Sequence, residues 1–203
     1  ALKQNLDASV DLFADMLRAP RFDQAEIDRV KATWIASIAQ EKARPNGAAM
    51  RVLPPLLYGA DHPYAIPFSG TGTEASIGSL TRDDLVRFHA QWVRPENATL
   101  VVVGDTSMKE LLPVLNRHFG DWKGAGEATA NPAIPEVARP AKSRVYLIDQ
   151  PGAIQANLFV GQLVPSTKDP NSVKFDIANS VLGGEFSSRL NMNLREDKHW
   201  AYG

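Results

Sequence analysis

The chain has 203 residues, no cysteine, and 22 lysine and arginine residues against 23 aspartate and glutamate residues, which gives a formal net charge of -1. Because these charges balance, we expect neither a nucleic acid nor an anionic membrane as a partner, and the lack of cysteine excludes disulfide and thiolate chemistry. The apolar runs are far shorter than the roughly 20 residues that a membrane helix needs. No leader pattern follows Ala1, so we expect these residues to be part of a longer protein.

The first half of the chain is predicted to be mainly helical. Apolar side chains recur at helical spacing over residues 6–17 and stop at Pro20, which ends the first helix. Asp23 caps a second helix that runs to about residue 40, and Val30 belongs to its apolar stripe. A third helix around residues 50–57 is followed by a long connection rich in glycine and proline, which is often a functional kind of loop.

Three apolar runs predict β-strands. They are rich in β-branched residues and cover residues 98–104, 145–148 and 156–164. Helices are expected before the first run, opened by Thr81, and again near residues 172–182. Because strands and helices are mixed without strict alternation, the sequence predicts an α+β fold rather than a doubly wound sheet.

Residues 124–141 are rich in alanine, glycine and proline and show no periodicity, which is typical of an extended linker. We therefore predict two domains, one over residues 1–123 and one over residues 142–203.

Residue patterns alone indicate no catalytic or metal site. The four histidines, His62, His89, His118 and His199, include no pair at the i, i+4 spacing of a helix-borne metal site. Ser187 and Ser188 lack a G-x-S-x-G context and are better interpreted as helix N-caps. The glycine pairs lack the surroundings of a phosphate-binding loop.

Four blocks, taken together and in order, resemble the pitrilysin/insulinase family of zinc peptidases, which includes the mitochondrial processing peptidase. They are "RFDQAEIDRVK", "YGADHPYAIP", "SLTRDDLVRFHAQWVRPENATLVVVGD" and "LGGEFSSRLNMNLREDKHWAYG". The resemblance implies two tandem, similar α+β domains of the processing-peptidase-like metallohydrolase fold. Here it covers the later part of the first domain, the linker and the early part of the second. In active members, an H-x-x-E-H helix upstream of this region binds Zn²⁺.

The resemblance also locates two expected carboxylates on the second helix, one a zinc ligand and one beside it. They fall on Val30 and Ser37, seven residues apart on one face, and neither residue can supply a carboxylate. A shifted alignment would instead offer Glu26 or Glu41. On the first alignment this chain holds no cofactor of its own, although active relatives hold zinc.

The resemblance assigns a second pair of residues to substrate binding. Arg195 and Tyr202 match an arginine and a tyrosine that hydrogen-bond the substrate backbone near the scissile carbonyl in active members. The alternative is that Arg195 caps a helix and Tyr202 packs in a strand. Glu185 departs from the family, which has glycine there, and a positive φ at this position would strain the loop.

Together these features predict a non-catalytic half or subunit of a zinc endopeptidase, which contributes substrate binding to a composite active site. The expected partners are a peptide substrate and a homologous half or subunit that bears zinc. Two alternatives remain: a structural scaffold without a peptidase role, and an active peptidase whose metal motif lies upstream. The sequence indicates no compartment, although a bacterial periplasmic setting is compatible with the resemblance.

Overall fold

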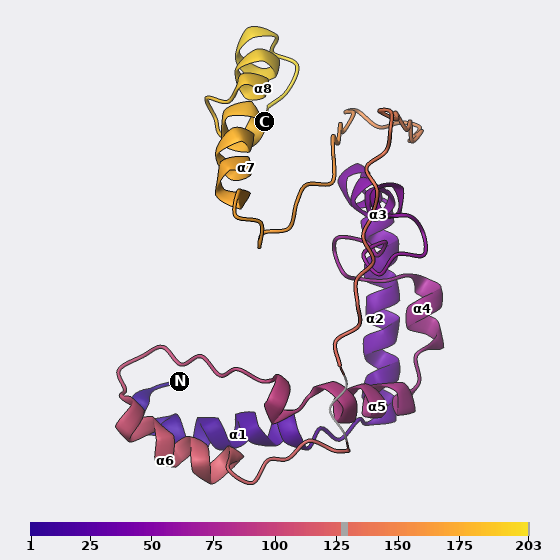
Figure 1. The fold of residues 1–203 in the computed structure, drawn as a ribbon. Coiled ribbons are helices and arrows are strands. Elements are labelled where there is room, and N and C mark those ends of the chain that lie inside the picture. The colour runs from indigo at the N-terminus through magenta and orange to yellow at the C-terminus, as the bar shows by residue number, and fades with distance from the viewer. Residues whose placement is uncertain (127–129, 203) are drawn as a thin grey trace. The chain divides into compact units, whose positions relative to one another are not determined.

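A computed structural model describes residues 1–126 and 130–202 of the chain (Figure 1). It divides into two compact units, which are treated separately below. The first unit comprises Ala1–Ala138 and Arg144–Phe159, and the second comprises Arg139–Ser143 and Val160–Gly203.

The described part of the first unit is built from helices joined by turns and loops. In chain order these are η1 (Lys3–Asn5), α1 (Leu6–Arg18), α2 (Gln24–Lys42), α3 (Pro45–Tyr58), α4 (Glu74–Ser79), α5 (Arg82–Trp92), η2 (Pro95–Asn97) and α6 (Met108–Phe119). None of the helices in the described residues is long and apolar enough to cross a membrane.

Side-chain caps start these helices where the sequence predicts. The Asp23 carboxylate accepts hydrogen bonds from the backbone N–H groups of Ala25, at 2.9 Å, and Glu26, at 3.4 Å, and so opens α2. At α5, Thr81 and Asp84 form a reciprocal capping box, in which each side chain accepts from the other residue's backbone N–H. The predicted starts of both helices are therefore confirmed.

Helices α1 and α6 lie side by side, as Figure 1 shows. Their contact contains Ala14 and Leu111, which are 4% and 5% exposed, and an edge-to-face pair of Phe13 and Phe119 with ring centroids 6.2 Å apart. An aromatic pair of this geometry adds about 0.5–1.5 kcal/mol beyond the burial of its area. This pairing makes one small apolar cluster of the first unit.

Helix α2 forms the other cluster, because α3 and α4 both pack against it (Figure 1). Ile38 is fully buried at this contact. The long loop predicted after α3 lies over residues 59–73, and the Trp34 indole N–H on α2 donates to the Thr71 carbonyl at 3.0 Å.

A hydrogen-bonded carboxylate fixes that loop. The Glu41 carboxylate accepts from the Arg51 guanidinium at 3.0 Å and from the hydroxyls of Ser69 and Thr71 at 2.7 and 2.8 Å. The same guanidinium also donates to the Gly72 carbonyl. Since the Glu41 and Arg51 side chains are 16% and 8% exposed, this network ties α2, α3 and the loop together away from bulk water.

The second unit is also helical in its described residues. It contains α7 (Ser172–Asn179), the π-helical turn η3 (Ser180–Gly184), α8 (Arg189–Asn191) and the π-helical turn η4 (Met192–Asp197). Ser188 is 2% exposed, and its hydroxyl accepts from the Asn191 backbone N–H at 3.4 Å, which confirms its interpretation as an N-cap.

The predicted α+β fold with two tandem, similar α+β domains is wrong for this structure. No strand occurs in residues 1–126 or 130–202, and the runs at 98–104, 145–148 and 156–164 have no regular structure. Their apolar side chains face solvent; Val103 is 93% and Leu147 95% exposed. A strand depends on hydrogen bonds to a neighbouring strand, and no described segment pairs with these runs.

The predicted linker, residues 124–141, has no helix or strand in its described part, while residues 127–129 lie outside the described residues. The buried Arg94 guanidinium holds its start by donating to the carbonyls of Ala125, at 2.6 Å, and Gly126, at 3.0 Å. The division into domains at residues 1–123 and 142–203 stays a prediction.

The Glu41 network predicts a stability that depends on pH. Hydrogen bonds from Ser69 and Thr71 and the charge of Arg51 lower the pKa of the Glu41 carboxyl. Because the pKa is lower in the folded state, this stabilisation is complete above the ordinary glutamate pKa and is lost as pH falls through the folded value, below about pH 4. We expect Glu41→Gln to lower the free energy of unfolding at pH 7 by roughly 1–3 kcal/mol and to remove this part of the acid sensitivity.

The matched control is Glu26→Gln on the same helix, because the Glu26 side chain is 63% exposed. Urea denaturation followed by circular dichroism between pH 3 and pH 7 would measure both variants. Equal losses of stability in the two variants would contradict the role given to the network.

Candidate functional site

The two positions where the resemblance expects carboxylates lie on one face of α2. Val30 is 44% exposed, so its assignment to a buried apolar stripe is wrong, whereas Ile38 on the same helix is fully buried. The Ser37 hydroxyl donates to the Thr33 carbonyl at 3.0 Å, within its own helix. This face therefore carries a methyl-bearing side chain and a hydroxyl that is already paired.

The acids that a shifted alignment would offer are held by arginines. Glu26 contacts the Arg29 guanidinium one turn along, with N–O distances of 2.7 and 2.9 Å. Glu41 is held by Arg51 and two hydroxyls, as described above. In the described residues no group of three or more histidine, aspartate or glutamate side chains is arranged to hold a metal ion. Neither glutamate therefore fits as a displaced zinc ligand.

Each histidine ring contacts a neighbouring group of the protein. Ring nitrogens lie 3.0 Å from the Pro135 carbonyl for His62, 2.7 Å from the Leu17 carbonyl for His89, and 3.1 Å from the Arg195 carbonyl for His199. The ring of His118 lies between two aspartates on α1, as described below.

Arg195 and Tyr202, by contrast, are brought together. The Arg195 Cζ lies 5.1 Å from the centroid of the Tyr202 ring and 4.7 Å from that of the Phe186 ring, so the guanidinium makes a cation–π contact with each ring. The Arg195 Nε forms an ion pair with the neighbouring Glu196 carboxylate, with an N–O distance of 3.3 Å. A cation–π contact at a partly exposed site contributes about 0.5–1 kcal/mol, so two of them favour one orientation of a long, flexible side chain.

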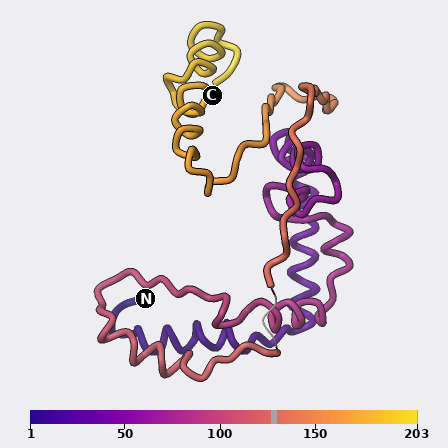
Figure 2. Tube along the Cα trace, viewed as in Figure 1, coloured from indigo at the N-terminus to yellow at the C-terminus, as the bar shows by residue number. Residues whose placement is uncertain are grey.

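The backbone after η4 produces this contact by reversing direction. The N–H groups of Trp200 and Ala201 both point back to the Leu194 carbonyl, at 2.9 and 3.3 Å, and His199 has a positive φ of 56°. The Cα trace in Figure 2 shows this end of the chain turning back along the second unit. Tyr202 thereby returns to Arg195 although seven residues separate them in sequence.

This geometry suits the binding of a peptide carbonyl. Two rings contact the guanidinium and Glu196 lies at its Nε, while its two terminal nitrogens carry further N–H donors. The Tyr202 side chain is 90% exposed, so its phenol is open to a ligand and does not pack in a strand. The Arg195 side chain contacts the Glu196 carboxylate and two aromatic rings. A side chain that caps a helix would instead contact the last carbonyl groups of that helix.

Glu185 adopts an ordinary extended conformation, with φ of -121° and ψ of 162°. The strain considered for a glutamate in place of glycine therefore does not arise. Sequence reasoning missed two residues of the site, Phe186 and His199. No sequence signal pointed to either, since an aromatic residue nine positions before an arginine follows no helical period, and histidine only occasionally adopts positive φ.

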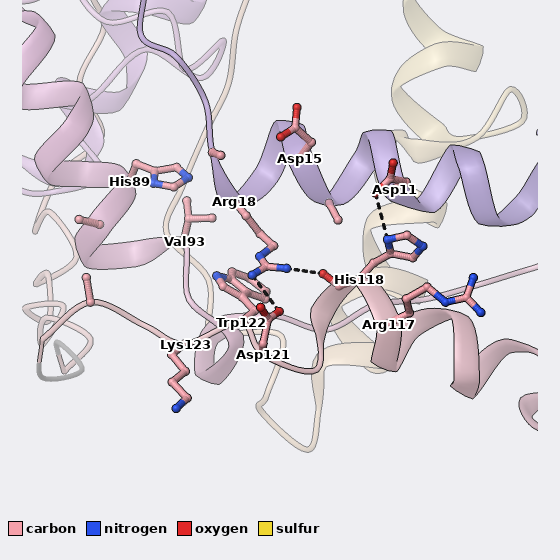
Figure 3. A pocket seen from close by; sticks show the side chains of 14 residues that line it. Asp11, Asp15, Arg18, His89, Val93, Arg117, His118, Asp121, Trp122 and Lys123 are labelled. Atoms are coloured by element: carbon pink, nitrogen blue, oxygen red, sulfur yellow. Dashed lines mark hydrogen bonds and ion pairs between the residues drawn. The ribbon is translucent and has the colours of Figure 1, made fainter.

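A separate cavity of about 690 Å³ lies among α1, α5 and α6 in the first unit (Figure 3). Its charged side chains largely neutralise one another: Arg18 pairs with Asp121 at 2.9 Å and His118 with Asp11 at 3.1 Å. The other ring nitrogen of His118 meets Asp7, whose pKa is lowered by this hydrogen bond and by Arg117. These pairs serve the packing of α1 on α6 and leave no concentrated charge for a ligand.

A family model described as "Peptidase M16 inactive domain" matches residues 79–203, which is more than half of the chain. The chain belongs to the peptidase M16 family. This finding confirms the resemblance to zinc peptidases read from the sequence. The chain is an M16 inactive-domain homologue of zinc proteases.

Curated relatives of the M16 chain include both peptidases and a non-peptidase. It is 26% identical over 201 residues to an uncharacterized zinc protease of Mycobacterium leprae, covering 99% of this chain and 44% of the relative. It is also 27% identical over 206 residues to the non-peptidase homologue YmxG of Helicobacter pylori, covering 99% and 45%. The chain thus spans less than half the length of these relatives.

Solved structures agree with this relationship. The crystal structure of a peptidase M16 inactive domain from Pseudomonas fluorescens superposes with a TM-score of 0.76 at 25% identity, covering 100% of this chain and 47% of that one. A protease from Helicobacter pylori gives a TM-score of 0.69 at 24% identity, covering 97% and 47%, which shows a likeness of fold.

The exposed face of α2 leads to a prediction about substitution. We expect Val30→Glu and Ser37→Glu to change the free energy of unfolding by no more than about 0.5 kcal/mol, because both positions face solvent. Ile38→Glu is the matched control on the same helix, and burial of its unpaired charge should cost about 3–5 kcal/mol. Urea denaturation would compare them. A cost for Val30→Glu as large as that for Ile38→Glu would show that Val30 packs against a surface.

Proposed function

We propose that this chain is a non-catalytic half or subunit of an M16 zinc metalloendopeptidase, and that it contributes substrate-backbone binding to a composite active site. The observation that carries the proposal is the Arg195 guanidinium in cation–π contact with both Phe186 and Tyr202, with an exposed phenol beside it. Arg195 and Tyr202 can bind a substrate but cannot activate a water molecule as a bound metal does. Across the part of the chain that the structure describes, no group of three or more histidine, aspartate or glutamate side chains is arranged to hold a metal ion.

The chemistry of the pair favours a carbonyl that gains negative charge. A guanidinium offers several N–H donors in a fixed plane, and the phenol offers one O–H donor. Donors held in advance at such a position stabilise an oxyanion without reorganising, because their orientation is already set. In this proposal Arg195 and Tyr202 hold the peptide backbone, while a homologous partner that carries the complete zinc motif supplies the metal.

The residues of α2 support assigning the metal to the partner. Zinc in a catalytic site takes three protein ligands, commonly histidine with glutamate or aspartate. Val30 and Ser37 offer no such donor, and Glu26 and Glu41 are held by arginines. The residues present in this chain therefore do not fit the third ligand of a zinc site.

Substrate contact by Arg195 and Tyr202 predicts complementation. The chain should raise the peptidase activity of a zinc-bearing homologue from the same organism towards a fluorogenic peptide, with little activity from either protein alone. We expect Arg195→Ala to lower kcat/KM of the mixture about 100- to 1000-fold, as the loss of one oxyanion donor does in other hydrolases. Tyr202→Phe removes one donor but keeps the ring, and should cost about tenfold.

Arg189→Ala is the matched control, since Arg189 lies on the neighbouring helix α8 and takes no part in the aromatic stack. Stimulation that survives Arg195→Ala would contradict the proposal. A complete lack of stimulation would favour the scaffold alternative. Stoichiometric zinc in the full-length form of this protein alone would favour the active peptidase.

A further inference from the structure

His199 occupies a backbone conformation that its side chain does not favour. Its φ is 56°, in the left-handed region, and Phe22 is the other described residue that has a positive φ without being glycine. A Cβ atom crowds the following carbonyl in this conformation, which is why glycine is preferred there and why asparagine and histidine tolerate it better than β-branched residues. Such a conformation persists where surrounding contacts hold it.

Those contacts converge on the end of η4. The His199 backbone N–H donates to the Arg195 carbonyl at 3.2 Å, and its imidazole Nδ1 lies 3.1 Å from the same oxygen. The Lys198 N–H donates to the Asn193 carbonyl at 2.9 Å. The last carbonyls of the helical turn, which have no partner further along a helix, are thereby satisfied by a chain that has turned back.

The reversal decides where Tyr202 lies. With His199 left-handed, the next two N–H groups meet the Leu194 carbonyl, and three residues after His199 the Tyr202 ring reaches the Arg195 guanidinium. An extended φ at His199 would direct the chain away from η4 and separate the two side chains. Phe186, which precedes α8, covers the guanidinium at 4.7 Å to its ring centroid.

We propose that His199 is a positioning residue, whose left-handed backbone brings Tyr202 onto Arg195, and that Phe186 completes the stack around the guanidinium. Only the substrate-binding role of Arg195 and Tyr202 rests on the proposed function. The geometric claim concerns this chain alone and is tested without a partner.

The test uses the full chain with isotope-labelled arginine and nuclear magnetic resonance. Protons of a side chain that lies over an aromatic ring are shifted upfield, so the Arg195 δ-proton signals should lie upfield of those of the other arginines. His199→Gly and His199→Asn keep the left-handed backbone and should retain the shift. His199→Val disfavours that backbone and should reduce the shift to the part that Phe186 contributes, as should Tyr202→Leu, while Tyr202→Phe should retain it in full.

Circular dichroism would confirm that the helices persist in each variant. An upfield shift that is undiminished in His199→Val, or one that is reduced equally in His199→Gly and His199→Val, would overturn the proposal. A reduced shift in Phe186→Leu supports the contact of its ring with the guanidinium, and an unchanged one contradicts the part given to Phe186.

In the complementation assay His199→Val should lower kcat/KM at least tenfold and His199→Gly should not. A normal shift with no complementation would refute the proposed function and leave the positioning intact.

Discussion

The Arg195 guanidinium contacts the rings of both Phe186 and Tyr202, and the function proposed for this chain depends on these contacts. A free arginine side chain samples many rotamers and would lose about 2 kcal/mol of conformational entropy on binding a ligand. Contacts with two rings order part of the side chain before a peptide binds. The backbone reversal at His199 brings Tyr202 to this contact.

The helices of the first unit could be predicted because local rules determine them. Asp23, Thr81 and Asp84 cap helix starts through hydrogen bonds that span only three residues. The strands could not be predicted in the same way. The run at 98–104 has the residues of a buried strand, but a strand also needs a neighbour, and none lies beside it in the described residues. Local composition therefore indicates that these runs favour an extended strand conformation, but it does not indicate whether a neighbouring strand is present to pair with them.

The same distinction applies to the candidate site, where a sequence pattern indicates some residues and tertiary contacts place the others. Arg195 and Tyr202, which the family pattern singles out, lie in contact, while nothing in the spacing revealed that Phe186 would contact the guanidinium too. Their role in substrate binding stays a prediction. The positive φ of His199 is a tertiary outcome, since histidine has no strong preference for it. On α2 the assignment of Val30 and Ser37 to the expected carboxylate positions stays a prediction, and the burial expected for Val30 is wrong, since its side chain is 44% exposed.

The central claim is that Arg195 contacts the substrate in a complex with a zinc-bearing homologue. The most direct measurement is the rate at which phenylglyoxal modifies each arginine of this chain, read by mass spectrometry, with and without an uncleavable peptide. The account predicts that peptide slows the modification of Arg195 in the complex and leaves that of Arg189 unchanged. Equal rates for Arg195 with and without peptide, in a complex that demonstrably binds the peptide, would contradict it.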